Sequence, residues 1–113
     1  MKLPKNAIIE REKLTQYLLV PKKRNDKSKW LAQAGYTIGN WQVLENDLRV
    51  LLVSSDATFI EETVYGKMYK IIGNLLGPAG KVLSVDTIWM IEGATKKTKF
   101  ITMYPYKQIG RIK

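Results

Sequence analysis

The sequence contains no cysteine and no histidine. The absence of cysteine excludes disulfides, thiolate zinc sites and cysteine nucleophiles. The absence of histidine removes the side chain that most often serves as a general base near neutral pH and most often binds metal ions. Any chemistry must therefore use lysine, arginine, tyrosine, hydroxyl, carboxylate or backbone groups.

Motifs for metal and nucleotide chemistry are also absent. The carboxylates are dispersed, and no Glu-x-Lys or Asp-x-Lys pair occurs, so the lysine–carboxylate signature of restriction-type nucleases is missing. The segment Gly77-Pro78-Ala79-Gly80 lacks the Gly-Lys-Ser/Thr ending of a phosphate loop and indicates a hairpin turn. We therefore expect no metal ion and no small-molecule cofactor.

Long apolar runs are missing as well. The strongest one, from Leu48 to Val53, is interrupted by Arg49 and is far too short to span a bilayer. The opening Met-Lys-Leu-Pro-Lys-Asn lacks the apolar core of a signal peptide. The length of 113 residues predicts a single domain, residues 1–113, that can bury a core of its own. We expect no membrane partner and a cytoplasmic site of action, either as a separate protein or as part of a larger one.

Positive charge is concentrated in two segments. Residues 21–30 hold five Lys or Arg and one acid, and residues 96–113 hold six and no acid. Together the two segments carry +10, whereas the remainder of the chain has a net charge of −1. A polyanion partner explains this separation, because each neutralised phosphate releases counterions and adds to affinity.

The pattern of apolar residues predicts helices first, over residues 9–53. Leu14, Tyr17 and Leu18 follow helical spacing, and Pro21 ends that helix. Asn25 or Asp26 can cap a second short helix that runs to about residue 34. A third helix begins near residue 40 and places its apolar residues on one stripe: Trp41, Leu44, Leu48, Leu51 and Leu52.

Antiparallel strands are predicted over residues 64–106. Residues 66–76, 81–91 and 100–104 read as strands, and the glycine-rich turn joins the first two. The predicted fold class is therefore α+β, with N-terminal helices packed on one face of a four- to five-stranded antiparallel sheet.

The last strand carries the first group of candidate site residues. Alternation places Phe100, Thr102 and Tyr104 on one face, with Ile101 and Met103 toward the helices. Thr102 and Tyr104 then point to an open face, flanked by Lys97, Lys99 and Lys107. Aromatic rings among lysines suit single-stranded RNA, whose bases stack while amines meet phosphates. The alternative is a half-buried tyrosine with solubilising lysines at a sheet edge.

The second group lies at the start of the second helix. Lys27 and Lys29 fall in its predicted first turn, where cations oppose the helix dipole. The neighbouring Lys22, Lys23 and Arg24 should lower the pKa of such a lysine further. A neutral lysine can act as a base and a charged one can hold a phosphate. The alternative is a solvated basic helix start.

Several segments in order resemble a known family. They are Lys2-Leu3-Pro4, residues 13–19 (KLTQYLL), residues 27–31 (KSKWL) with Gly35-Tyr36, residues 65–69 (YGKMY), residues 76–80 (LGPAG), residues 85–89 (VDTIW) and Thr102-Met103-Tyr104-Pro105. This order is similar to an uncharacterised bacterial family of small domains, found alone or at the tips of polymorphic toxins. It also resembles the wider Barnase–EndoU–colicin–RelE group of ribonuclease toxins, many of which end in a Thr-x-Tyr-Pro-like strand.

The resemblance implies metal-independent cleavage of RNA, often transfer RNA, on the sheet face. It further implies an acidic immunity protein as partner and delivery as the C-terminal tip of a larger secreted effector. Thr102 and Tyr104 match the closing motif, and Lys27 matches the basic residue that opens the second helix in similar toxins. The histidine pair of EndoU-type members is absent, so their acid–base scheme does not apply.

We hypothesise the following roles in a cleavage that leaves a 2′,3′-cyclic phosphate. Lys27 is either the base or the charge that stabilises the phosphorane, supported by Lys29. Tyr104 donates the proton or stacks on a base. The remaining residues are assigned to substrate binding: Lys97, Lys99 and Lys107 hold phosphate, Thr102 and Thr87 form hydrogen bonds, and Trp89 either stacks on a base or belongs to the core.

Two other functions remain open on the sequence. The missing histidine favours a non-catalytic module, such as a phage accessory protein that holds RNA or DNA. The basic segments also fit an interaction protein that docks an acidic protein partner.

Overall fold

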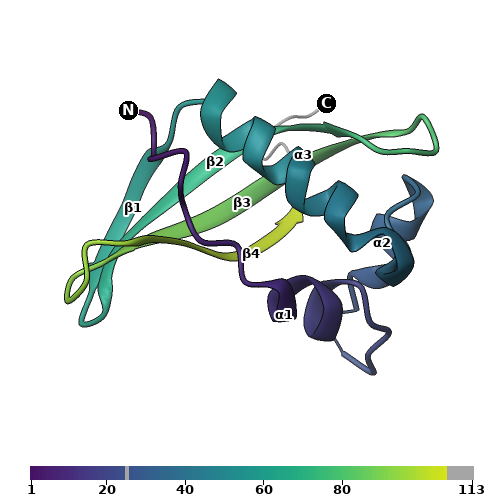
Figure 1. The fold of residues 1–113 in the computed structure, drawn as a ribbon, viewed down its shortest axis with the longest axis horizontal. Helices are drawn as coiled ribbons and strands as arrows, with labels where there is room; N and C mark the ends of the chain where they lie inside the picture. The colour runs from purple at the N-terminus through teal and green to yellow at the C-terminus, as the bar shows by residue number, and fades with distance from the viewer. Residues whose placement is uncertain (25, 107–113) are drawn as a thin grey trace, which may run out of the picture.

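The computed structural model describes residues 1–24 and 26–106. It has an α+β fold, in which helical segments come first and an antiparallel sheet follows (Figure 1). The helical segments are α1 (Arg11–Lys13), the π-helical turn η1 (Leu14–Leu18), α2 (Ser28–Gln33), the 3₁₀ turn η2 (Ile38–Asn40) and α3 (Trp41–Ser54). The strands are β1 (Thr58–Thr63), β2 (Gly66–Leu76), β3 (Val82–Glu92) and β4 (Thr98–Pro105). The predicted fold class is confirmed.

The sheet is a meander of four strands in the order β1-β2-β3-β4, with every neighbouring pair antiparallel. The observed β2 has the predicted bounds, and β3 and β4 differ from prediction by one or two residues at their ends. β1 was not predicted as a strand. Five of its six residues are exposed, so its sequence lacks the apolar alternation that marks a half-buried strand.

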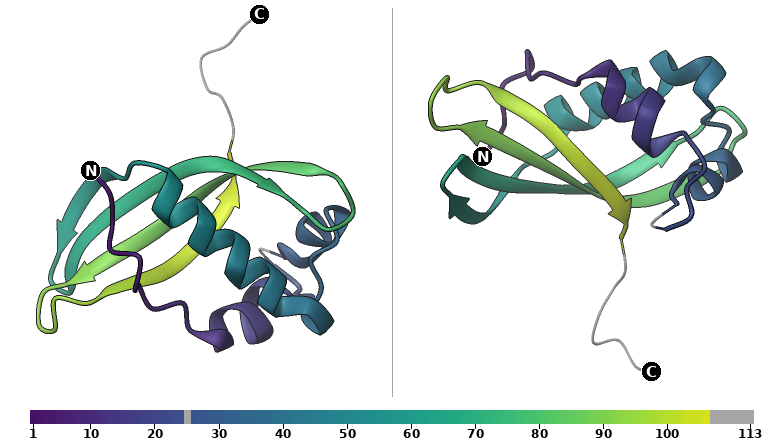
Figure 2. Two further views of the ribbon diagram at one scale, coloured as in Figure 1. Left: turned by 45° about the horizontal axis from the view of Figure 1, so that its top comes forward. Right: turned by 90° about the horizontal axis from the view of Figure 1, so that it is seen from below.

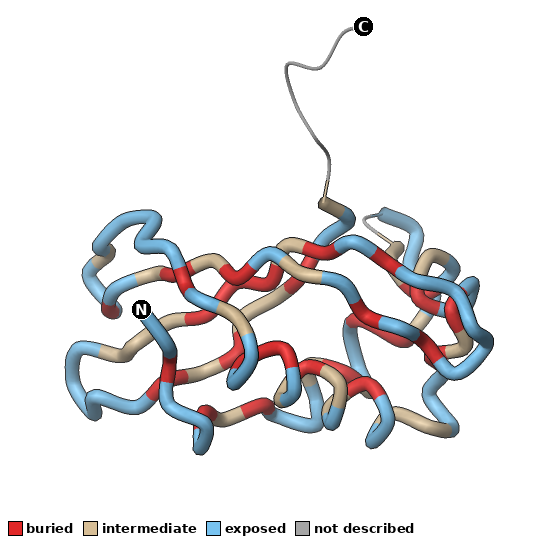
Figure 3. The backbone as a smooth tube through the Cα atoms, turned by 90° about the horizontal axis from the view of Figure 1, so that it is seen from above, coloured by how far each residue is buried: buried red, intermediate tan, exposed pale blue. Residues whose placement is uncertain are grey.

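The core lies between the helices and one face of the sheet (Figures 2 and 3). The predicted apolar stripe of α3 is confirmed: its four leucines are buried, and the partly buried Trp41 packs against the core. The sheet contributes residues such as Ile71, Val85 and Trp89. α3 comes so close to β2 that a Cβ at position 73 would meet the end of the Leu51 side chain, which would have to move to admit it.

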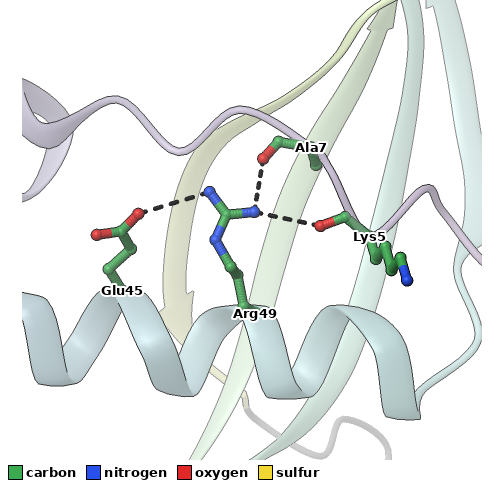
Figure 4. Close-up of polar contacts among 4 residues, drawn as sticks. All are labelled: Lys5, Ala7, Glu45 and Arg49. Atoms are coloured by element: carbon green, nitrogen blue, oxygen red, sulfur yellow. Dashed lines mark hydrogen bonds and ion pairs between the residues drawn. The ribbon is translucent and has the colours of Figure 1, made fainter.

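The N-terminal segment runs beside β4 before the first helix begins. Ile8 donates its N–H to the Thr98 carbonyl (2.7 Å) and accepts from the Phe100 N–H (2.8 Å), as in a parallel bridge. Arg49 of α3 holds this segment from the other side, because its guanidinium donates to the carbonyls of Ala7 (2.8 Å) and Lys5 (3.3 Å) (Figure 4). The segment is therefore fixed between α3 and the edge of the sheet.

The first helical segment differs from the prediction. After one α-helical turn it becomes a π-helix, in which the Leu19 N–H bonds to the Leu14 carbonyl (3.0 Å). Leu14, Leu18 and Leu19 are buried, whereas Tyr17 is 56% exposed. The expectation that Tyr17 belongs to the apolar stripe is wrong, because the wider π-turn changes which residues share a face.

β4 departs from simple alternation. Thr102 pairs with Ile88 and Phe100 pairs with Trp89, so Ile101 is an extra residue that forms a β-bulge. Phe100 and Met103 consequently both face the core, with 1% and 0% exposure. The predicted phase was right for Thr102, Tyr104 and Met103, but wrong for Phe100 and Ile101. In the part of the chain that the structure describes, no helix has the length and apolar character needed to cross a membrane.

Candidate nucleic-acid site at the β4 edge

Three residues that the sequence singled out lie together. The Lys27 amine donates to the Thr102 hydroxyl over 3.4 Å and lies 5.0 Å from the centre of the Tyr104 ring. Thr102 and Tyr104 sit on the sheet face that the helices leave uncovered, and Lys27 reaches them from the loop before α2. Residues 75 positions apart in the chain thus form one contact group.

Local hydrogen bonds fix the start of α2. Asp26 Oδ1 accepts from the Ser28 N–H (2.8 Å) and the Ser28 hydroxyl (2.6 Å). This turn makes Lys27 the residue that immediately precedes α2, instead of a member of its first turn as predicted. Asp26 therefore forms a side-chain-bonded turn immediately before α2. The Lys27 side chain takes no part in this turn and points at β4.

Lys27 has a lowered pKa, as the sequence predicted. The main cause is partial burial, which disfavours the charged form, and the ammonium of Lys22 lowers the pKa further. The helix dipole that was expected to act is not needed to explain the direction. A lysine in this setting holds its proton less tightly than a solvated one.

A pocket of about 510 Å³ adjoins this group. It opens where the N-terminal segment leaves β4, just beyond the Ile8–Phe100 hydrogen bond, and the bulge turns Ile101 toward it. Its walls come from the N-terminal segment, η1, the basic loop and β4. The lining residues are Glu10, Glu12, Lys13, Tyr17, Leu18, Lys22, Lys27, Ile101 and Thr102.

The pocket wall contains residues that sequence reasoning did not select. Lys22 places its amine 4.3 Å from the centre of the exposed Tyr17 ring. Glu10 and Glu12 add negative charge beside a group for which no carboxylate was predicted. Of these residues, only Lys22 could have been suspected from the sequence, because it belongs to the basic segment of residues 21–30.

The remaining predicted lysines are not brought to this group. Lys97 and Lys99 lie near the opposite end of β4, and a separation of five strand residues puts Lys99 about 17 Å from Tyr104. Lys99 is paired with Glu92 at 2.8 Å, and this hydrogen bond raises the pKa of Lys99. Lys29 is exposed on α2 and does not line the pocket. Lys107 lies outside the described residues.

Thr87 and Trp89 were predicted to touch substrate, and their positions contradict this. Both side chains are fully buried, on the sheet face that packs against the helices. The Trp89 indole N–H donates to the Thr87 hydroxyl (2.8 Å), which in turn donates to the Ile71 carbonyl (2.9 Å). The Phe100 ring packs edge-on against Trp89 at 5.3 Å. Trp89 therefore belongs to the core, which was the alternative to base stacking. The Thr87 hydroxyl provides the hydrogen-bond acceptor that its buried indole N–H needs.

The described residues include no group of three or more Asp and Glu side chains placed to hold a metal ion. The chemically active groups of the site and its pocket are an amine with a lowered pKa, two phenols, a hydroxyl, two further lysines and two carboxylates. These groups can transfer protons and bind a phosphate-containing ligand.

The class of fold is shared with a solved protein. A chain of the contact-dependent growth inhibition toxin–immunity protein complex from Klebsiella pneumoniae 342 matches with a TM-score of 0.67 and 15% sequence identity. The match covers 91% of this chain and 96% of that one, so it shows a common fold over nearly the whole length. No curated protein matches the sequence.

Family membership follows from a second comparison. The model of the family described as "Domain of unknown function (DUF6883)" matches residues 2–107, and the chain belongs to this family.

Proposed function

We propose that this protein is a metal-independent endoribonuclease of bacterial toxin type, which cuts transfer RNA or another structured RNA and leaves a 2′,3′-cyclic phosphate. The observation that carries the proposal is the convergence of Lys27, Thr102 and Tyr104 beside a pocket. The segregated positive charge and the fold shared with a chain of a toxin–immunity complex support it.

The reaction needs a base, a proton donor and positive charge at the phosphate. A neutral Lys27 amine takes the proton from the ribose 2′-hydroxyl, and the 2′-oxygen attacks phosphorus. The bond from phosphorus to the 5′-oxygen breaks as the Tyr104 hydroxyl gives its proton to that oxygen. The products are a cyclic phosphate and a 5′-hydroxyl, and solvent returns both protein groups to their starting protonation states.

The surrounding residues support these two roles. The Thr102 hydroxyl accepts a hydrogen bond from Lys27 and so directs the amine across the edge of β4. Lys22 lowers the pKa of Lys27 and adds positive charge where the phosphorane forms. In this proposal Lys97 and Lys99, near the far end of β4, bind backbone phosphates several nucleotides away; Lys99 is paired with Glu92 in the free protein.

The partner and the route of delivery follow the same proposal. An endoribonuclease that acts in the cytoplasm endangers the cell that makes it, so an acidic immunity protein is expected to cover the basic site. The solved complex that shares the fold contains a toxin and an immunity protein. Delivery of this domain at the tip of a larger secreted effector completes the proposal.

The test uses purified full chain incubated with total RNA in the presence of EDTA. We expect discrete fragments that carry cyclic phosphate and 5′-hydroxyl ends. Lys27→Ala and Tyr104→Phe should each reduce the rate by about 100-fold or more, the usual effect of losing a general acid or base. The matched controls are Lys5→Ala and Tyr65→Phe, because the Lys5 side chain is exposed and Tyr65 is 73% exposed in the β1–β2 turn.

Two outcomes would redirect the proposal. RNA that is bound but remains intact identifies the protein as a non-catalytic binding module. The absence of histidine favours that alternative. RNA cut equally by wild type and both site variants means that the activity does not arise from these residues.

A further inference from the structure

We propose that the pocket beside Lys27 is a subsite for one nucleotide of single-stranded RNA, in which the base stacks on Tyr17 and its exocyclic amino group donates to Glu10 or Glu12. The inference rests on the proposed function and adds a base preference to it: adenine, cytosine or guanine over uracil.

The size of the pocket is the first argument. Its volume of about 510 Å³ lies within the range of small-molecule sites. A phosphate group alone would leave most of that space empty. The apolar side chains of Leu18 and Ile101 contribute to its wall, which suits the flat apolar face of a base more than it suits a solvated anion.

The distribution of charge is the second argument. Lys22 and Lys27 stand on the side of the basic loop, whereas Glu10 and Glu12 belong to the N-terminal segment and α1, where, among the described residues, Lys13 is the one cation that also lines the pocket. Within residues 1–24 and 26–106 neither carboxylate takes part in an ion pair. The intervening Arg11 does not neutralise them, because its guanidinium lies over the Trp41 ring at 5.8 Å. A ligand with an anionic end and a hydrogen-bond-donating end fits such a pocket, and a nucleotide has both.

The stacking surface is the third argument. Tyr17 is turned outward by the π-helical turn and is 56% exposed, yet it lines the pocket and its ring is held by the Lys22 amine. Aromatic rings at basic sites bind bases by stacking, and every base has a face that can stack. The prediction that Tyr17 belongs to the apolar stripe does not account for the exposure of its ring, whereas a role in base binding does.

Base preference follows from the chemistry of carboxylates. A carboxylate only accepts hydrogen bonds. Adenine, cytosine and guanine carry an exocyclic amino group that donates, whereas uracil presents carbonyl oxygens at its corresponding edges. A carboxylate of Glu10 or Glu12 that meets the amino position attracts those three bases and repels the uracil carbonyl there, whereas the one ring donor of uracil, its N3–H, lies at a neighbouring ring position.

The experiment compares cytidine and uridine monophosphates, which differ at ring position 4, an amino group in cytosine and a carbonyl in uracil, and in the proton that uracil carries on N3. Titration of the full chain, followed by NMR or calorimetry, should give CMP an affinity about ten times that for UMP, within the range of a single good pairing. The double variant Glu10→Gln/Glu12→Gln should abolish the preference, since an amide also donates to the uracil carbonyl. Tyr17→Ala should weaken both ligands equally, and Tyr65→Ala should change neither.

Equal affinity of wild type for CMP and UMP, no binding of either, or a preference that survives the double variant would overturn the inference. Thermal melting of each variant shows whether it is folded. Because the titration involves no cleavage, the two proposals fail separately. RNA cleavage without base preference removes only the subsite, and base preference without cleavage removes only the endoribonuclease.

Discussion

Arg49 provides the sharpest stability prediction, because it holds the N-terminal segment, which leads into one wall of the pocket, by hydrogen bonds. Its guanidinium donates to the carbonyls of Ala7 at 2.8 Å and Lys5 at 3.3 Å, and pairs with Glu45 at 3.5 Å (Figure 4). The side chain is 37% exposed, so each charged hydrogen bond contributes about 1 kcal/mol, below the range for buried ones. The pair with Glu45 adds only about 0.3 kcal/mol.

Arg49→Ala should therefore lower the free energy of unfolding by about 2 kcal/mol, which corresponds to a fall in Tm of about 8 °C for a chain of this size. Calorimetry measures this change. Glu45→Gln is the matched control and should shift the Tm by no more than about 2 °C. Amide hydrogen exchange at Ile8 and Phe100 should accelerate in Arg49→Ala, since these two amides hold the segment to β4. Unchanged Tm and unchanged exchange at these amides would refute the reasoning.

Three further predictions concern the site and the core. Thr87→Val should cost about 2 kcal/mol by leaving the Trp89 indole unpaired, measured by urea unfolding, while a change in RNA affinity would contradict its structural role. Thr102→Val should slow RNA cleavage about tenfold, since it removes the acceptor that directs the Lys27 amine, and an unchanged rate would contradict this. Below the lowered pKa of Lys27 the cleavage rate should rise about tenfold per pH unit, and Lys22→Ala should move the profile to higher pH by raising that pKa; a flat profile would contradict the base role.

The sequence predicted most of the fold because its strongest periodicities survive packing. The leucine stripe of α3 is observed in full, and the alternation of β3 is observed from Val82 to Thr87, beyond which Ile88 is buried as well as Trp89. β1 was missed because an exposed edge strand has no apolar alternation to detect. The β-bulge at Ile101, which changes the faces of Phe100 and Ile101, was not predicted. A bulge depends on how two strands pair, and the sequence of one strand does not contain that information.

The site was predicted in part for similar reasons. Lys27, Thr102 and Tyr104 were selected by local chemistry and by motif order, and they do converge. Thr87 was assigned to substrate binding, and Trp89 either to base stacking or to the core, but both side chains are fully buried on the face of β3 that packs against the helices. Glu10 and Glu12 carried no signal, because the pocket they line forms only when the N-terminal segment leaves β4.

The central claim is that Lys27 acts as a base toward RNA, and replacing it by arginine tests this most directly. Arginine keeps the positive charge but does not give up its proton at accessible pH. With transfer RNA in EDTA, Lys27→Arg should lose cleavage about as completely as Lys27→Ala while still binding RNA. Cleavage by Lys27→Arg at the wild-type rate would contradict the account, since the residue would then serve only as a charge.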